Sequence, residues 1–187
     1  MTERVLAETR AWVDRAVVGL QLCPFAKAPQ VKGQVRYVAS DAVDADALLS
    51  DLVDELKLLA AEPPDRIETT LLVHPRVFAD FEDHNDFLEI AEAALVALDL
   101  EGVIQIASFH PDYRFADSDP DDIANATNRS PHPTLHLLRE ESIERALATF
   151  ADPDSIFEAN IATMQRIGVA GWAALRRQCR DDAERDG

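Results

Sequence analysis

Side chains suited to acid–base chemistry and to anion binding concentrate in one segment, residues 105–140 (QIASFHPDYRFADSDPDDIANATNRSPHPTLHLLRE). The segment begins as a hydrophobic strand pattern, passes through a polar, proline-rich excursion and ends in a pattern that enters a helix. Long excursions of this kind are uncommon in compact domains unless they serve a function. We therefore expect the functional site to lie in this segment.

The first candidate is an anion site at Asn128-Arg129-Ser130-Pro131, which reads as the start of a helix with Ser130 at the N-cap. Free backbone N–H groups at such a start bind anions, and the guanidinium of Arg129 offers paired donors to a carboxylate or phosphate. We predict that Arg129 and Arg139 bind a small anionic ligand, which Asn128 and Ser130 position. The alternative is a plain helix cap with a surface arginine.

His110 and His136 are the predicted catalytic residues, because histidine titrates near neutral pH. On a helix, His132 and His136 would share a face, and with His110 they could hold a divalent metal such as zinc or iron. His74, which ends another strand pattern, is a further candidate. The alternative is that these histidines are exposed or are satisfied by backbone hydrogen bonds.

Cys23 is a candidate nucleophile for thiol-dependent redox chemistry. It follows the C-terminal end of a helix pattern, where the partial negative charge disfavours the thiolate. A buried structural cysteine is therefore the preferred interpretation. The acidic run Asp117–Asp122 lacks the spacing of a calcium loop and is interpreted as a solvated turn.

Apolar periodicity predicts the elements that must position these residues. Helices are expected at 2–21, 43–61, 77–98 (broken near 83–85) and 155–180, and strands at 34–39, 68–74 and 103–109. Residues 131–150 fit either one helix or a strand at 135–138 followed by a helix from Ser142, and we prefer the helix. Gly168 and Gly171 indicate a kink or close packing in the last helix.

The alternating order of helices and strands predicts an α/β fold, with a small, mainly parallel sheet of three or four strands flanked by helices and a helical C-terminal third. In such a sheet the residues that follow the strands, Ser40, His74 and His110, share one rim, where ligands bind in open parallel sheets.

A length of 187 residues and a hydrophobic content of 47% suit a single globular domain, residues 1–187, whose tail from about residue 180 is expected to fray. A net charge of −17 argues against nucleic acid and anionic membranes as partners. The sequence contains no signal-peptide pattern, no apolar run of membrane-spanning length and no disulfide framework. We expect a cytoplasmic protein, with its oligomeric state left open.

Four stretches carry a family resemblance: GLQLCPFA, ETTLLVHP with the following FADFEDHNDFL, LEGVIQIASFHPDYRFA, and TNRSPHPTLHLLREESIERA. Over about residues 5–176 the chain resembles an uncharacterised bacterial family, also found in some photosynthetic eukaryotes and known only as a domain of unknown function. The family carries tyrosine at the position of His132, which favours His110 and His136 as the better pair. The motif positions that the resemblance implies are Cys23, His110, Asn125, Asn128, Arg129, Ser130, Pro131, His136 and Arg139.

We therefore predict an enzyme that acts on a small anionic metabolite. The substrate-binding residues would be Arg129, Asn128, Ser130, Arg139, Tyr113 and Asn125, with acid–base or metal-holding roles for His110 and His136. Two alternatives remain: a non-catalytic binding or adaptor module with an exposed recognition loop, and a redox protein that uses Cys23. The family resemblance carries no reaction, so the reaction type and the substrate stay open.

Overall fold

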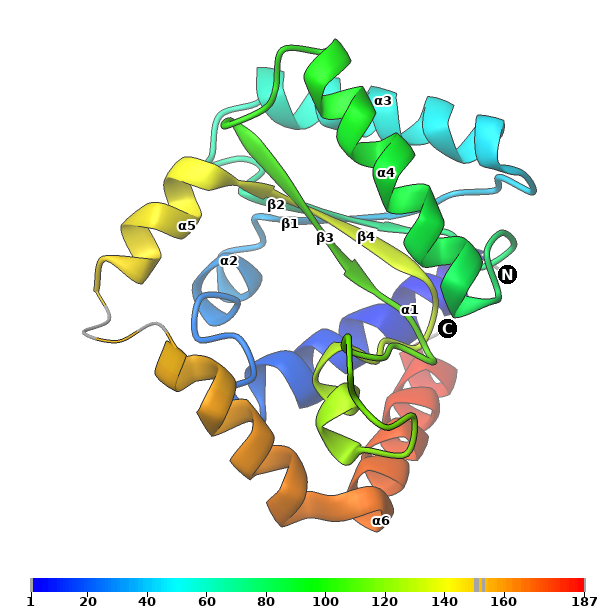
Figure 1. Ribbon diagram of the computed structural model, residues 1–187, viewed down its shortest axis with the longest axis vertical. Coiled ribbons are helices and arrows are strands. Elements are labelled where there is room, and N and C mark those ends of the chain that lie inside the picture. Colours follow the sequence, from blue (N-terminus) through cyan, green and yellow to red (C-terminus); the bar gives the residue numbers. More distant parts are fainter. Residues whose placement is uncertain (1, 150–151, 153, 187) are drawn as a thin grey trace.

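The computed structural model describes residues 2–149, 152 and 154–186. A four-stranded sheet lies between two helical layers (Figure 1). Its strands are β1 (Val35–Ala39), β2 (Thr69–Val73), β3 (Ile104–Phe109) and β4 (Thr134–Arg139), in the order β1-β2-β4-β3. β1 and β2 pair in parallel, whereas β4 is antiparallel to both β2 and β3. The first three strands therefore run in one direction and β4 runs in the other.

Helices α3 (Ala45–Ala61) and α4 (Phe81–Ala97) cover one face of the sheet (Figure 1). Asp44 caps α3 by accepting a hydrogen bond from the Ala47 N–H, and Asp80 caps α4 in the same way. The leucines of α3 recur at helical spacing and pack on sheet residues to form the larger hydrophobic core. Fully buried members of this core include Leu48, Leu52, Leu56, Leu59, Leu72, Leu135 and Leu137.

The opposite face is covered by α1 (Thr2–Trp12), its π-helical continuation η1 (Val13–Val18), and α6 (Asp154–Asp186). Trp12, Met164 and Trp172 form the centre of this second core, together with Tyr37 and Leu71 from the sheet. The short elements α2 (Lys27–Val31), the 3-10 helix η2 (Ile123–Asn128) and α5 (Glu140–Leu147) complete the chain.

The predicted α/β class, the flanking helices and the helical C-terminal third are confirmed. The sheet was predicted to be mainly parallel, but only β1 and β2 pair in parallel; the other strand pairs are antiparallel, because β4 inserts between β2 and β3. The preference for a helix over residues 131–150 was wrong: residues 134–139 form β4, and α5 follows at Glu140. Leu135 and Leu137 both point into the larger core, and this two-residue period is what a strand requires.

Two helix boundaries also differ from expectation. α4 runs without a break from Phe81, and the residues before it form a loop in which Phe78 has a positive φ of 57°. The tail expected to fray continues α6 to Asp186. It is held because Cys179 and Ala183 are buried and because Asp182 pairs with Arg15 of η1. The expected kink in α6 is present at Gly168.

The predicted rim is present. Ser40, His74 and His110 follow the carboxyl ends of the three co-directional strands. The segment that leads into β4 closes this edge, because the His74 N–H donates to the Pro133 carbonyl (2.9 Å) and the His110 N–H donates to the Asn128 carbonyl (3.3 Å). Among the described residues, no helix is both long and apolar enough to cross a membrane.

Candidate functional site

Three histidines, His74, His84 and His110, pack together next to the rim. The ring of His84, from the first turns of α4, lies 5.2 Å from that of His74 and 5.2 Å from that of His110, centroid to centroid. All three side chains are fully buried. His74 donates from Nδ1 to the Val77 carbonyl (3.2 Å), whereas its Nε2 and both ring nitrogens of His84 have no partner among the described residues.

The cluster of His74, His84 and His110 is closed to solvent, and its imidazole rings are neutral. His110 donates from Nε2 to the Phe78 carbonyl (3.1 Å) and accepts at Nδ1 from the Asp112 N–H (3.0 Å), so both of its nitrogens are engaged. Burial lowers the pKa of His74 to about 4 and that of His84 to about 3, and it also lowers the pKa of His110. Within the described chain, no three His, Cys, Asp or Glu residues are arranged to hold a metal ion.

His136 lies on the other side of the sheet. Thr134 pairs with Phe109 and His136 with Ala107, so these four side chains share one face and His110, the next residue after Phe109, points to the opposite face. His136 accordingly packs on Phe109, with Nε2 2.7 Å from the Thr69 Oγ1. The structure does not bring the predicted pair His110 and His136 together, and the two do not form a metal centre here.

Arg139 does not join Arg129 at an anion. It ends β4, and a six-residue strand separates its two ends by roughly 20 Å at about 3.3 Å per residue. Its guanidinium donates to the carbonyls of Leu59 (2.7 Å), Glu62 (2.6 Å) and Ile67 (2.9 Å). Arg139 therefore satisfies the free carbonyls at the end of α3 and fixes the connection to β2.

Three of the residues predicted to bind substrate instead stabilise the polar loop between β3 and β4. Fully buried Asn125 accepts from the Phe115 N–H (3.0 Å) and donates to the Asp119 carbonyl (2.8 Å). The Tyr113 hydroxyl is hydrogen-bonded to the Asn128 side chain, and burial raises the pKa of this tyrosine. Asn125, Tyr113 and Asn128 thus order the loop between β3 and β4.

The predicted helix start at Ser130 is absent. Asn128 ends the 3-10 helix η2, and an irregular segment leads from there to β4. The Ser130 hydroxyl is not an N-cap, because it donates to the His132 carbonyl (2.6 Å). An anion at Arg129 and Ser130 therefore receives no help from a helix N-terminus.

Arg129 and Ser130 nevertheless line a cavity of ≈ 120 Å³ between α1, residues 129–131 and the C-terminal half of α6. Arg129 is fixed there because its Nε donates to the Tyr113 carbonyl (3.1 Å) and its Nη2 to the Pro120 carbonyl (2.9 Å). The complete lining consists of Glu8, Trp12, Arg129, Ser130, Pro131, Trp172, Arg176, Cys179 and Arg180.

Positive charge dominates this cavity. Three lining residues are arginines, whereas Glu8 is the single carboxylate, so the lining carries two net positive charges. Arg176 and Arg180 lie one turn apart on α6, and neither makes a hydrogen bond or ion pair within the part of the chain that the structure describes. Both side chains are exposed, so a ligand can reach them from solvent.

The remaining walls are two indoles and a thiol. Trp12 and Trp172 are 3% and 5% exposed, and neither Nε1–H has an acceptor among the described residues. Burial raises the pKa of Cys179 to about 11, so this side chain is a neutral thiol. The cavity therefore offers mostly donors and apolar surface.

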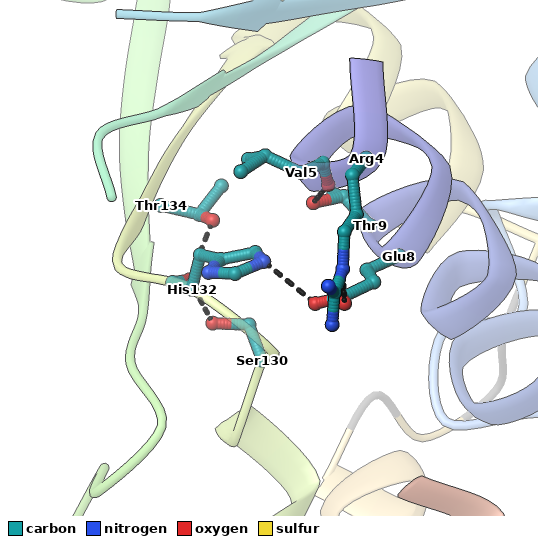
Figure 2. Close-up of polar contacts among 7 residues, drawn as sticks. All are labelled: Arg4, Val5, Glu8, Thr9, Ser130, His132 and Thr134. Atoms are coloured by element: carbon teal, nitrogen blue, oxygen red, sulfur yellow. Dashed lines mark hydrogen bonds and ion pairs between the residues drawn. The ribbon is translucent and has the colours of Figure 1, made fainter. Parts of the chain in front are cut away.

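A hydrogen bond links Glu8, which lines the cavity, to His132, which follows the lining residues 129–131 in the chain (Figure 2). His132 donates from Nε2 to Glu8 Oε2 (2.9 Å), and the other oxygen of Glu8 accepts from Arg4 Nε (3.0 Å). Thr134 Oγ1 donates to the His132 carbonyl (2.8 Å), the same acceptor that Ser130 uses. Burial lowers the pKa of His132, and Glu8 opposes this shift.

A second hollow, of ≈ 540 Å³, lies outside the rim between the start of α4 and residues 114–118. Its lining is acidic, and its one arginine, Arg114, pairs with Glu82 (3.4 Å). An anion would be repelled there, so we assign the candidate site to the smaller cavity. Cys23 lies outside both hollows; burial raises its pKa, as expected for a structural thiol.

Sequence reasoning missed Glu8, Trp12, Arg176 and Arg180. Their spacing was readable: residues 8 and 12 on the first helix, and residues 172, 176 and 180 on the last, lie four apart and so share a helical face. The fact that these two faces meet depends on the packing of α1 against α6. No pattern within either helix specifies that contact.

The chain belongs to the family described as protein of unknown function (DUF1415), whose model matches residues 4–174. The resemblance seen in the sequence motifs is thereby confirmed. No curated protein and no solved structure matches the chain. Arg176 and Arg180 lie just beyond the matched residues, so family membership alone does not point to them.

Proposed function

We propose that this member of the family binds a small anion, a carboxylate or a phosphate, in the cavity between α1, residues 129–131 and α6. The observation that carries the proposal is the set of three arginines, Arg129, Arg176 and Arg180, around a cavity with one carboxylate. This local excess of positive charge stands out in a chain whose net charge is −17.

Electrostatics on α6 support a bound anion. Like charges four residues apart destabilise a helix by about 0.2–0.5 kcal/mol, and Arg176 and Arg180 have this spacing. Acidic side chains are not scarce, since the chain has 35 Asp and Glu against 18 Lys and Arg. The nearby Asp182 instead pairs with Arg15 and Arg185. An anion between the two arginines would offset their repulsion.

The neighbouring donors support the same ligand. Arg129 is already held by two backbone carbonyls, so little conformational entropy would be lost when its remaining N–H groups bind. A guanidinium fork matches carboxylate and phosphate oxygens in geometry as well as in charge.

The acid–base roles expected for His110 and His136 are not part of this proposal. His110 has both nitrogens engaged and is closed to solvent, and His136 packs between Phe109 and Thr69. We propose that the protein acts in the cytoplasm, a proposal that its two free cysteines support, because thiols are kept reduced in that compartment.

Tryptophan fluorescence provides the test, because the only two tryptophans in the sequence, Trp12 and Trp172, both line the cavity. Inorganic phosphate titrated in low-salt buffer should change the fluorescence saturably. Arg176→Ala and Arg180→Ala should each weaken binding about tenfold, the equivalent of about 1.4 kcal/mol.

Arg177→Ala is the matched control, since Arg177 is an exposed arginine of the same helix that does not line the cavity. Its affinity should equal that of the wild type. The proposal is overturned if wild type gives no saturable change, or if all three variants weaken binding equally, which would indicate only a diffuse charge effect.

A further inference from the structure

We propose that anion binding in this cavity is coupled to proton uptake by His132, with Glu8 holding the imidazole so that Nδ1 is the atom protonated. This inference concerns the regulation of the anion site and rests on the function proposed above. It assigns a role to His132, which the family resemblance had made a weaker candidate than His110 and His136.

The hydrogen bond to Glu8 determines the tautomer of His132. Because a carboxylate only accepts hydrogen bonds, the contact between His132 Nε2 and Glu8 Oε2 (2.9 Å) places a proton on Nε2. The lone pair of the neutral ring is then on Nδ1, which has no partner among the described residues. The His132 side chain is 22% exposed, so a proton from solvent can reach it.

The position of His132 is fixed by contacts with two residues that line the cavity. Glu8 and Ser130 both line the cavity. The ring of His132 is hydrogen-bonded to Glu8, and the backbone carbonyl of His132 accepts a hydrogen bond from the Ser130 hydroxyl (Figure 2). Its backbone is further held by Thr134. A charge that appears on this ring therefore lies one hydrogen bond away from the carboxylate of the cavity wall, on a residue with little freedom to move away.

The electrostatic balance at His132 depends on the charged groups around it. Arg4 and Glu8 face it from α1, Arg129 lies in the segment that leads to it, and Arg176 and Arg180 lie across the cavity on α6. The only other titratable lining group is the Cys179 thiol. In the ligand-free protein, burial and Arg4 disfavour the imidazolium, and Glu8 alone favours it.

A bound anion changes this balance, because it adds negative charge to the cavity that Glu8 lines and partly cancels the arginines. The pKa of His132, which burial holds below its ordinary 6.5, then rises. Linkage requires the reciprocal effect: affinity for the anion increases as pH falls from above the pKa of the complex toward that of the free protein. The increase amounts to about tenfold for each unit by which the anion raises the pKa.

Sulfate is the probe, because its charge stays constant over the pH range in which histidine titrates. Sulfate affinity is measured from roughly pH 8 to pH 5. Proton uptake is measured by calorimetry in two buffers that differ in ionisation enthalpy. Wild-type protein should bind about tenfold more tightly at the acidic end of that range and take up a fraction of a proton in the middle of it.

His132→Gln is the matched variant, because a glutamine amide can still donate to Glu8 but cannot take up a proton. It should bind sulfate with an affinity that does not change with pH and with no proton uptake. Glu8→Gln should diminish the uptake, because a neutral amide no longer stabilises the imidazolium. The proton measurement on wild type does not depend on how either variant folds.

The outcomes separate the two proposals. If wild type binds no sulfate at any pH, the anion site itself fails and the coupling fails with it. Sulfate binding that stays constant with pH and involves no proton uptake overturns the coupling alone. Uptake that persists undiminished in a folded His132→Gln variant also overturns it, because another group would then be the one that titrates.

Discussion

The imidazole rings of His74 and His84 stack in the protein core, with centroids 5.2 Å apart and planes inclined by 21°. His84 has no hydrogen-bond partner at either nitrogen among the described residues, and His74 has none at Nε2. The ring of His74 also packs edge-on against Phe78, and the ring of His84 packs against His110. These histidines therefore behave as buried neutral groups whose protonation the fold opposes.

The first prediction is acid destabilisation. The pKa of His74 is about 4 and that of His84 about 3 in the folded state, against an ordinary value of 6.5 when unfolded. The unfolded chain therefore binds more protons below pH 6.5, and stability that is fully present above that pH is lost as pH falls toward 4. Between pH 7 and pH 5 the loss is roughly 2 kcal/mol per histidine, measurable by urea unfolding.

His84→Phe tests the cause. Phenylalanine keeps a flat ring of similar size, leaves no unpaired nitrogen and cannot titrate. The variant should be at least as stable as wild type at pH 7 and should lose about 2 kcal/mol less between pH 7 and pH 5. If it shows the wild-type loss on acidification, His84 is not the group responsible.

The second prediction concerns Arg139, which was expected to bind substrate and instead bonds the carbonyls of Leu59, Glu62 and Ile67. Arg139→Ala leaves these acceptors unpaired and should reduce the free energy of unfolding by about 2–4 kcal/mol. Arg139→Lys keeps the positive charge but lacks the planar set of guanidinium donors, so it should recover only part of the lost free energy of unfolding. Anion affinity, measured by tryptophan fluorescence, should stay unchanged in any variant that folds; a tenfold loss would return Arg139 to the binding site.

The third prediction concerns the kink in α6 at Gly168, where φ is 62° and ψ is −178°. This region of backbone space is open almost only to glycine. A methyl group there would meet no atom within 4 Å, so Gly168→Ala tests backbone strain alone and should destabilise the fold by about 1–3 kcal/mol. Gly171→Ala, in regular helix but 3.1 Å from the Ile167 Cβ, is the control and should change stability by less. Equal effects of the two substitutions would show that the kink does not require glycine at position 168.

Local sequence patterns were sufficient for β1, β2 and β3, because each is an apolar run bounded by turn residues. Residues 134–139 were different, since TLHLLR followed by an acidic run fits a helix as well as a strand. What decides the structure is tertiary: β4 fills the space between β2 and β3 and pairs with both. No property of the six residues themselves specifies that gap.

The candidate site was predictable only in part, for the same reason. Arg129 and Ser130 were identified from their types and their place in the long excursion, and both line the cavity. The pairing of His110 with His136 failed because strand parity places them on opposite faces, and parity follows only once β4 is known to be a strand. Arg176 and Arg180 come from the end of the chain, and their role depends on the contact between α6 and α1.

The last prediction is that the cavity prefers dianions. Its lining has three guanidiniums and one carboxylate, and a compact dianion would neutralise the two remaining charges within ≈ 120 Å³. Sulfate or a small dicarboxylate should therefore bind about tenfold more tightly than acetate or nitrate. Since Arg176 and Arg180 are exposed, added salt should weaken binding as the screening length falls to about 8 Å near physiological ionic strength. The double variant Arg176→Ala, Arg180→Ala should lose the preference, because one guanidinium then faces one carboxylate. Equal affinity of the wild type for sulfate and acetate would contradict this charge assignment.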